Sequence, residues 1–147
     1  MKTVTIMRGL PGSGKTHWVR TNKPQAKVVS ADLFFMDGFE YKYDSRRLGE
    51  AHNWCLRQYI QLLNIYTLGG DLDIVVDNTN TGVFEIAPYY RLAEVFGFDV
   101  GIVWIQSSTL VCMARNTHGV PPVSIQSMAN KFDCLPPWWK QTIIVSQ

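Results

Sequence analysis

Short apolar runs alternate with longer amphipathic stretches along the whole chain. The apolar runs have the length of strands and cover residues 2–7, 27–31, 72–76, 99–105 and 142–145. Continuous apolar character is typical of strands that are covered on both faces, as they are in parallel sheets. We therefore predict five strands that are buried between layers of helices.

The stretches between these runs predict the helices. The shorter helices are expected at residues 15–21, 83–96, 108–116 and 121–132. A longer helix begins after a cap at Asp44 or Ser45 and ends at Gly69-Gly70. Its apolar positions recur at three- and four-residue steps, which places them on one face of the helix. These positions are Leu48, Ala51, Cys55, Tyr59, Leu62 and Tyr66.

Strands that alternate with helices predict one α/β domain over residues 1–147. About five parallel strands should form its sheet, with helices on both faces. In such sheets ligands bind beyond the carboxyl ends of the strands. Three polar clusters follow predicted strands in this way, at residues 9–16, at Asp32 and at residues 77–80. We expect them to lie close together.

Composition and charge narrow the class of protein only a little. Hydrophobic residues make up 46% and charged residues 18% of the 147 positions, as in ordinary globular domains. The formal net charge of +2 is too small to establish a nucleic-acid partner by itself. The chain has neither the pattern of a signal peptide nor a run of about 20 apolar residues. We expect no membrane partner and a cytoplasmic protein, in the host cytoplasm if it is viral.

The cysteines point to a reducing compartment. Cys55, Cys112 and Cys134 are odd in number and widely spaced, and they form no C-x-x-C pair. Cys55 and Cys112 fall in apolar, helix-like patterns. We therefore expect these two to be reduced core residues.

The most specific motif is a phosphate-binding loop at residues 9–16. It matches G-x-x-x-x-G-K-[ST] in full, between a predicted strand and a predicted helix. Glycines let backbone N–H groups turn toward anionic oxygens, and the start of the helix adds its positive end. The motif predicts a P-loop NTPase fold that binds ATP and Mg²⁺. The binding residues are Gly9, Leu10, Pro11, Gly12, Ser13, Gly14, Lys15 and Thr16.

Particular side chains of this loop and of the strand ends have predicted roles. Lys15 can reach the β- and γ-phosphates, and the Thr16 hydroxyl can ligate Mg²⁺. A kinase also needs a carboxylate near the acceptor hydroxyl, and Asp32 stands where that group should be. The alternative role for Asp32 is that of a loop or helix cap. Asp77 is its rival as the base and can equally hold Mg²⁺ through water.

Five blocks of the sequence together resemble the polynucleotide-kinase-like branch of P-loop kinases. They are residues 8–16 (Arg-Gly-Leu-Pro-Gly-Ser-Gly-Lys-Thr), 30–35 (Ser-Ala-Asp-Leu-Phe-Phe), 50–55 (Glu-Ala-His-Asn-Trp-Cys), 76–80 (Val-Asp-Asn-Thr-Asn) and 114–121 (Ala-Arg-Asn-Thr-His-Gly-Val-Pro). This branch includes the 5′-hydroxyl kinase domain of phage polynucleotide kinases and the NEDD4-binding-protein-2-like ATPases. The resemblance covers about residues 4–132.

The resemblance implies roles for individual residues. Asp32 matches the family's catalytic aspartate, and Arg115 matches a lid arginine that stabilises the phosphates. Asn78 and Asn80 match the polar motif at a strand end that lines the acceptor site, with Asn78 in place of an aspartate. Phe35 stands where phage enzymes have an arginine that grips acceptor phosphate. Where those enzymes carry a second lid arginine, His118 or no counterpart is present.

These departures leave the acceptor open between two kinds of nucleic-acid hydroxyl. One is an ordinary 5′-hydroxyl end. The other is the hydroxymethyl group of a modified pyrimidine in DNA, as in viral 5-hydroxymethyluridine DNA kinases, and we expect DNA rather than RNA. Five aromatic residues between positions 34 and 43 could form a pocket for a flipped base or could pack onto the core. A small-molecule kinase and a non-catalytic ATP-binding module are the other two classes.

Three further residues are candidates for substrate contact, namely Arg46, Arg47 and His52. Arg46 and Arg47, with Lys42, either form a patch that grips phosphate or pair with Asp44 and Glu50. His52 is expected to be a packed, hydrogen-bonded histidine, although its match to the family gives it a second possible role at the substrate.

Overall fold

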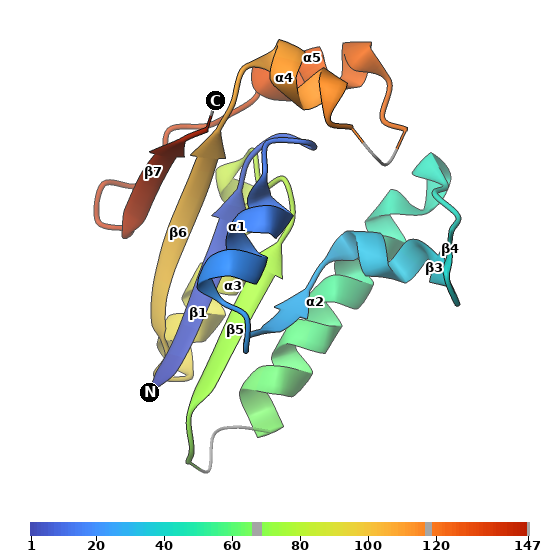
Figure 1. Cartoon of the computed structure of the whole chain (residues 1–147). Coiled ribbons are helices and arrows are strands. Elements are labelled where there is room, and N and C mark those ends of the chain that lie inside the picture. The colour runs from blue at the N-terminus through green and yellow to red at the C-terminus, as the bar shows by residue number, and fades with distance from the viewer. Residues whose placement is uncertain (66–68, 117–118, 147) are drawn as a thin grey trace.

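The computed structural model describes residues 1–65, 69–116 and 119–146. Within these residues, five strands form one parallel sheet in the order β2-β5-β1-β6-β7 (Figure 1). The strands are β1 (Lys2–Arg8), β2 (Lys27–Val29), β5 (Leu72–Asp77), β6 (Asp99–Gln106) and β7 (Gln141–Val145). The predicted five-stranded parallel sheet is confirmed.

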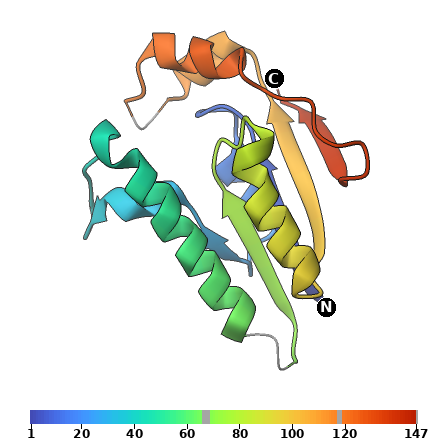
Figure 2. The ribbon, with the colours of Figure 1, turned by 180° about the vertical axis from the view of Figure 1, so that it is seen from behind.

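Helices cover both faces of the central strands, as the sequence predicts, but the edge strand β7 is largely exposed and not buried as expected. The α-helices are α1 (Lys15–Asn22), α2 (Leu48–Ile65), α3 (Val83–Val95), α4 (Thr109–Ala114) and α5 (Pro122–Ala129). The first of these, α1, lies on one face, and α2 and α3 lie on the other (Figures 1 and 2). The short helices α4 and α5 lie beyond the carboxyl ends of the strands. None of the helices in the described parts of the chain is long and apolar enough to cross a membrane.

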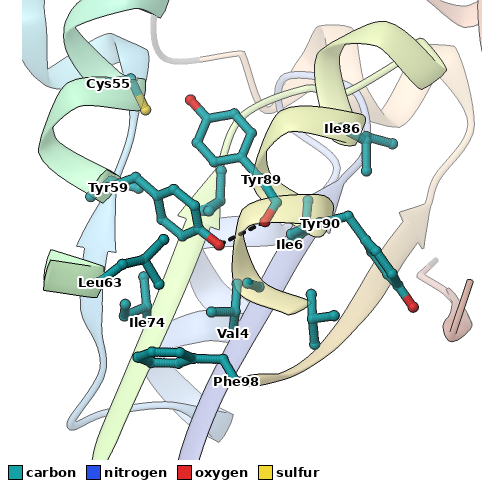
Figure 3. Close-up of a cluster of buried hydrophobic side chains, with 14 of the residues drawn as sticks. Val4, Ile6, Cys55, Tyr59, Leu63, Ile74, Ile86, Tyr89, Tyr90 and Phe98 are labelled. Carbon is teal, nitrogen blue, oxygen red and sulfur yellow. Dashed lines mark hydrogen bonds between the residues drawn. The ribbon is translucent and has the colours of Figure 1, made fainter. Parts of the chain in front are cut away.

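The main core lies between the sheet and the pair α2 and α3 (Figure 3). Val4 and Ile6 from β1 meet Tyr59 of α2 and Tyr89 of α3 there, and all four side chains are buried. The Tyr59 hydroxyl donates a hydrogen bond to the Tyr89 carbonyl oxygen at 2.7 Å. A buried polar group costs stability only when it has no partner, so this tyrosine is tolerated in the core.

The buried face of α2 differs from the predicted one at its ends. Its fully buried positions are Ala51, Cys55, Tyr59 and Leu63, each four residues from the last. Leu62 is only partly buried, and Leu48 is 40% exposed. After Tyr59 the helical period permits either a three- or a four-residue step, so the pattern alone cannot choose between Leu62 and Leu63. The predicted core position Tyr66 lies outside the described residues.

The segment between β2 and α2, for most of which the sequence pattern predicts no element, contains regular structure. Its first part is the 3₁₀ helix η1 (Ala31–Phe35), and a small antiparallel hairpin follows, formed by β3 (Met36–Asp37) and β4 (Glu40–Tyr41). Gly38, with φ of +65°, lies in the turn of this hairpin. A second 3₁₀ helix, η2 (Ser45–Arg47), precedes α2, and Asp44 caps it through the Arg46 amide. Asp44 therefore caps this 3₁₀ helix, whereas the long helix that it was predicted to cap begins at Leu48.

The connections of the strands leave a crevice at one place along the sheet. After β1 the chain passes through α1 to β2, on the far side of β5. After β5 it passes through α3 to β6, on the far side of β1. The loops that follow these two neighbouring strands therefore diverge, which is the usual position of a ligand in such sheets. Met7 and Asp77 pair at the ends of the two strands.

Candidate active site

The loop between β1 and α1 is a tight turn that is built around glycine. Gly12 has φ of +80°, and a Cβ atom there would lie 2.4 Å from the Cys112 carbonyl oxygen in α4. Both constraints exclude any residue with a side chain. The Ser13 amide donates to the Leu10 carbonyl oxygen at 3.0 Å and closes the turn. The Ser13 hydroxyl is buried, and no group in the described residues hydrogen-bonds it.

The loop leads into an open helix N-terminus. Gly14, with φ of +105°, takes the cap position of α1, and no side chain of the described residues caps this helix. The first turn of α1 also carries no acidic residue. The N–H groups of a first turn have no partners within the helix and carry partial positive charge. This end of α1 is therefore suited to bind an anion such as phosphate.

Lys15 contacts the phosphate loop and is within electrostatic range of two carboxylates. Its ammonium donates to the carbonyl oxygens of Gly9 at 2.9 Å and Leu10 at 3.0 Å. Burial lowers the pKa of the Lys15 ammonium, and the charges of Asp77 and Asp32 act in the opposite direction. Lys15 is thus within electrostatic range of both predicted carboxylates, which are 17 and 62 residues away from it in the sequence.

Thr16 and Asp77 form the pair predicted for a metal ion. The Thr16 hydroxyl donates to Asp77 Oδ2 at 3.0 Å, across 61 residues of sequence. Asp77 is the last residue of β5, and Thr16 is the second residue of α1. Hydroxyl and carboxylate oxygens are the hard ligands that Mg²⁺ takes, so the two residues fit this ion.

Asp32 lies within the short helix η1 and not directly after a strand, because β2 ends two residues earlier than predicted. β2 ends at Val29, and Asp32 is the second residue of η1, because the Ser30 hydroxyl accepts a hydrogen bond from the Asp32 amide at 3.2 Å and starts the helix. The Asp32 carboxylate is exposed. Its Oδ1 accepts a hydrogen bond from the Tyr41 hydroxyl at 3.1 Å. The carboxylate is therefore both accessible to an acceptor and held in place.

Asn78 and Asn80 form buried hydrogen bonds to neighbouring segments of the protein. This corrects the expectation that they line the acceptor site. Asn78 is 8% exposed and Asn80 is 2% exposed. Asn78 Oδ1 accepts from the Ala31 amide at 2.8 Å and so ties β5 to η1. Asn80, with φ of +51°, donates from Nδ2 to the Met7 carbonyl oxygen at 2.7 Å. Both amides face protein groups, so little of either side chain is left to meet an acceptor.

Phe35 is also turned inward. It is 4% exposed and belongs to the main core, so its ring cannot serve as the predicted substrate contact. Its edge packs against Tyr41 and Tyr43, with ring centroids 6.2 Å and 5.1 Å away. Of the two roles left open for the aromatic segment, packing onto the core applies to this residue.

The arginines before α2 pair with neighbouring carboxylates. Arg46 Nη2 lies 3.0 Å from Asp44 Oδ2, and Arg47 Nε lies 2.8 Å from Glu50 Oε2. This is the second of the two arrangements that the sequence leaves open. The pairs are largely exposed, so each contributes little to stability and can open when an acceptor binds. A role for these arginines at the substrate stays a prediction.

The structure tests the prediction for His52 but not the one for His118. His52 is exposed on α2, next to the buried Ala51, so the expectation of a packed histidine is wrong. The exposed position leaves its predicted contact with substrate untested. His118, the predicted lid residue, lies outside the described residues.

A cavity of about 600 Å³ lies beside the phosphate loop. One face of α1 forms a wall of this cavity, with contributions from the ends of β6 and β7. Arg115, which follows α4, lines it as well and is exposed. The residues from the loop and α1 are Gly14, His17, Trp18, Thr21 and Asn22.

The motifs in the sequence do not point to this wall. A signal is nevertheless present, because positions 14, 17, 18, 21 and 22 follow three- and four-residue steps from the end of the phosphate loop. Such steps put side chains on one face of a helix. His17 and Trp18 offer this face flat aromatic surface, which suits a planar ligand group.

Arg8 is a buried hub beneath the site that the sequence motifs do not identify as functional. It is 1% exposed, and its guanidinium lies 4.4 Å from the centre of the Trp104 ring. It donates to the carbonyl oxygens of Asn80 at 2.9 Å, Thr81 at 2.7 Å and Asp133 at 2.6 Å. Burial lowers the pKa of Arg8, while the charge of Asp133 opposes that shift. This side chain joins the loop after β5 to the segment after α5.

We expect Arg8→Met to lower the free energy of unfolding by about 3 kcal/mol, because three buried carbonyl groups lose their donor. Urea denaturation of the purified protein measures this. Arg91→Met is the matched control, since Arg91 is exposed and pairs with Glu94 on the surface. Its change should stay within about 0.5 kcal/mol. Equal effects of the two substitutions would show that Arg8 does not join these segments.

The fold and these residues define a P-loop domain with a kinase-like architecture. A family model described as an AAA domain matches residues 4–118, and the chain belongs to this family. The resemblance to the NEDD4-binding-protein-2-like branch is also confirmed. The chain is 29% identical over 136 residues to NEDD4-binding protein 2 of Homo sapiens, which covers 88% of this chain and 8% of that protein.

Solved structures of small kinases share the fold. A sugar kinase from Janibacter sp. HTCC2649 has a TM-score of 0.63 and 17% identity, covering 99% of this chain and 86% of the other. The APS kinase of Mycobacterium tuberculosis, solved with AMPPNP and APS, has a TM-score of 0.59 and 17% identity, with coverage of 98% and 88%. At this identity the likeness extends to the fold alone.

Proposed function

We propose that this chain transfers the γ-phosphoryl group of ATP to a hydroxyl group on nucleic acid. The observation that carries the proposal is the convergence of three groups at the crevice of the sheet. Lys15 lies within the phosphate loop, and Thr16 contacts Asp77 at 3.0 Å. Asp32 is brought beside them because the neighbouring Ala31 amide donates to Asn78 Oδ1 at 2.8 Å. A site that only binds nucleotide needs no exposed carboxylate at the position of Asp32.

The donor half of the site follows from the loop and the cavity. The triphosphate would bind to the backbone amides of residues 9–16 and to the Lys15 ammonium, as phosphate groups do at such loops. The adenosine would occupy the 600 Å³ cavity beside Trp18, which has the size of an ordinary ligand pocket. Thr16 and Asp77 would hold Mg²⁺, which supplies neutralising charge on the phosphate oxygens.

The acceptor half depends on Asp32. An acceptor hydroxyl next to this carboxylate can pass its proton to Asp32 while its oxygen forms a bond to the γ-phosphorus. The bond from that phosphorus to the β,γ-bridging oxygen breaks, and ADP leaves. Lys15 would stabilise the charge that develops on the phosphoryl oxygens.

The hairpin beside Asp32 favours a nucleic-acid acceptor. Phe39 at its turn is fully exposed, and Met36 is 41% exposed, so apolar surface faces solvent next to the site. Exposed aromatic rings are the groups on which unpaired bases stack. A 5′-hydroxyl end or a hydroxymethylated base would bring such a base to this surface. We propose that the nucleic acid carrying this acceptor hydroxyl is DNA rather than RNA.

A small-molecule hydroxyl is the second candidate acceptor. The pairing of the cationic side chains between the hairpin and α2 favours it. Lys42 lies 3.0 Å from Asp37, and Arg46 and Arg47 pair with their own neighbours. Cations that are already paired attract a phosphate backbone less strongly than free ones. A nucleoside or a sugar would not need them.

A transfer assay with radiolabelled ATP separates these candidates. The acceptors are 5′-hydroxyl DNA, 5′-hydroxyl RNA, DNA that contains hydroxymethyluracil, and a panel of nucleosides and sugars. Label on DNA that depends on Asp32 supports the proposal. Label only on a nucleoside or sugar would replace it with the second candidate. ATP binding without transfer to any acceptor would indicate a regulatory ATP-binding module.

Arg115→Ala should reduce turnover about 100-fold, the usual effect of removing one group that stabilises transition-state charge. Arg115 lines the cavity together with Gly14, so its guanidinium can reach the phosphate side of the donor. The binding constant for ATP should change much less, because the charge develops mainly during transfer. Saturation kinetics and calorimetry measure the two effects. An unchanged rate at saturating substrates would remove Arg115 from the site.

A further inference from the structure

The candidate base, Asp32, accepts a hydrogen bond from the side chain of Tyr41. Tyr41 belongs to β4 of the hairpin, nine residues after Asp32, and its hydroxyl donates to Asp32 Oδ1 at 3.1 Å. The other oxygen, Oδ2, accepts no hydrogen bond from the residues that the structure describes. One oxygen is therefore bound by the protein, and the other is left for an acceptor.

The Tyr41 ring is fixed by its neighbours. It stacks on Tyr43 with ring planes 10° apart and centroids 6.4 Å apart, and the edge of Phe35 supports it at 6.2 Å. Phe35 is anchored in the core at 4% exposure. The Lys42 amide donates to the Phe35 carbonyl oxygen at 2.9 Å and ties the end of the hairpin to η1. The hydroxyl of Tyr41 thus has little freedom to leave Asp32.

Its ionisation suits a permanent donor. Burial raises the pKa of the Tyr41 phenol, and the charge of Asp32 and its hydrogen bond to the phenol raise it further. Tyr41 therefore keeps its proton across the physiological range. It cannot compete with Asp32 for the proton of an acceptor.

We propose that Tyr41 is a positioning residue that orients Asp32 for catalysis, an inference that rests on the proposed phosphoryl transfer. By holding Oδ1, Tyr41 fixes the rotation of the carboxylate and directs Oδ2 toward the acceptor hydroxyl. The proton of that hydroxyl passes to Oδ2 as its oxygen bonds to the γ-phosphorus and ADP departs. A carboxylate that rotated freely would spend only part of its time in this orientation.

Tyr41→Phe removes the hydroxyl and keeps the ring that stacks on Tyr43. We expect kcat for phosphoryl transfer to fall about ten-fold, in line with the loss of a hydrogen bond to a charged group. The affinity for ATP should stay the same, since the phosphate loop is not touched. Tyr43→Phe is the matched control, because it removes a hydroxyl from the neighbouring ring of the same stack, and its kcat should change less than about two-fold.

A double-substitution cycle distinguishes orientation from a general effect on structure. In the Asp32→Asn background, adding Tyr41→Phe should change the residual rate by less than about two-fold, because the group that Tyr41 orients is already disabled. A further ten-fold loss in that background would show that Tyr41 acts independently of Asp32 and would overturn the proposal.

A titration tests the contact without any acceptor. Tyrosine labelled with ¹³C at Cζ reports the ionisation of each phenol by NMR, and Asp32→Asn should make Tyr41 ionise at a lower pH than in the parent chain. An unchanged Tyr41 titration would overturn the contact itself. If the parent chain transfers phosphate to no acceptor while Tyr41 does shift, the proposed function fails and the contact stands.

Discussion

Lys15→Ala is expected to reduce phosphoryl transfer by more than about 10³-fold and to remove measurable ATP binding. The Lys15 ammonium is the cation in the phosphate loop, and it would bear on both the bound triphosphate and the charge that develops during transfer. Its present partners are the carbonyl oxygens of Gly9 and Leu10, which belong to the same loop. The hydrophobic core is not involved, so the chain should still fold.

Calorimetry with ATP and Mg²⁺ measures the binding, and circular dichroism checks the fold. Lys140→Ala is the matched control, because Lys140 is exposed and pairs with Asp99 at the start of β6, at the end of the sheet opposite the phosphate loop. It should bind ATP like the parent chain. If Lys15→Ala also binds ATP with nearly the parent affinity, residues 9–16 do not form the phosphate site.

The sequence predicts those parts of the site whose position follows from the course of the backbone, namely the phosphate loop and the strand ends. Residues 9–16 combine glycines, Lys15 and Thr16 in one local motif, so their loop can be predicted without knowing the rest of the fold. The contact between Thr16 and Asp77 spans 61 residues, yet it too follows from the sequence. Both residues come after parallel strands that end at the same edge, and strand ends can be located from apolar runs.

Side-chain direction is the part that the sequence leaves undetermined. Asn78 and Asn80 follow a strand, as site residues do, but they turn inward to bond Ala31 and the Met7 carbonyl. A polar residue after a strand can face either way, since both directions satisfy its hydrogen bonds. The direction of the Arg8 side chain is equally hard to predict. Arginines are rarely fully buried unless they are paired, and the sequence does not show the partners that let Arg8 reach 1% exposure.

The aromatic segment after Asp32 shows the same limit. From sequence, Phe35 and Tyr41 are two members of one cluster that could bind a base or pack onto the core. In the structure Phe35 is buried, and Tyr41 reaches the candidate base. The difference arises from the hairpin, whose two-residue strands are too short to give a periodic signal. Tertiary packing decides which ring meets Asp32.

The second prediction with a large effect concerns Asp32 and uses Asp77 as its counterpart. Both carboxylates act on Lys15, and either could take the proton of an acceptor hydroxyl. Their surroundings separate them. Asp77 accepts a hydrogen bond from Thr16, which is the arrangement for a metal ion, whereas Asp32 is exposed beside the hairpin. We therefore assign the base to Asp32 and the metal to Asp77.

Asp32→Asn should lower the rate of transfer about a thousand-fold, within the range of general-base catalysis, and leave ATP affinity unchanged. The amide has almost the same shape, and its oxygen can still accept the Tyr41 hydrogen bond, so only the capacity to take a proton is lost. The dependence of ATP binding on Mg²⁺ should stay as in the parent chain. Asp77→Asn should shift that dependence to higher Mg²⁺ concentration. Near-parental transfer by Asp32→Asn, together with an inactive Asp77→Asn, would reverse the two assignments.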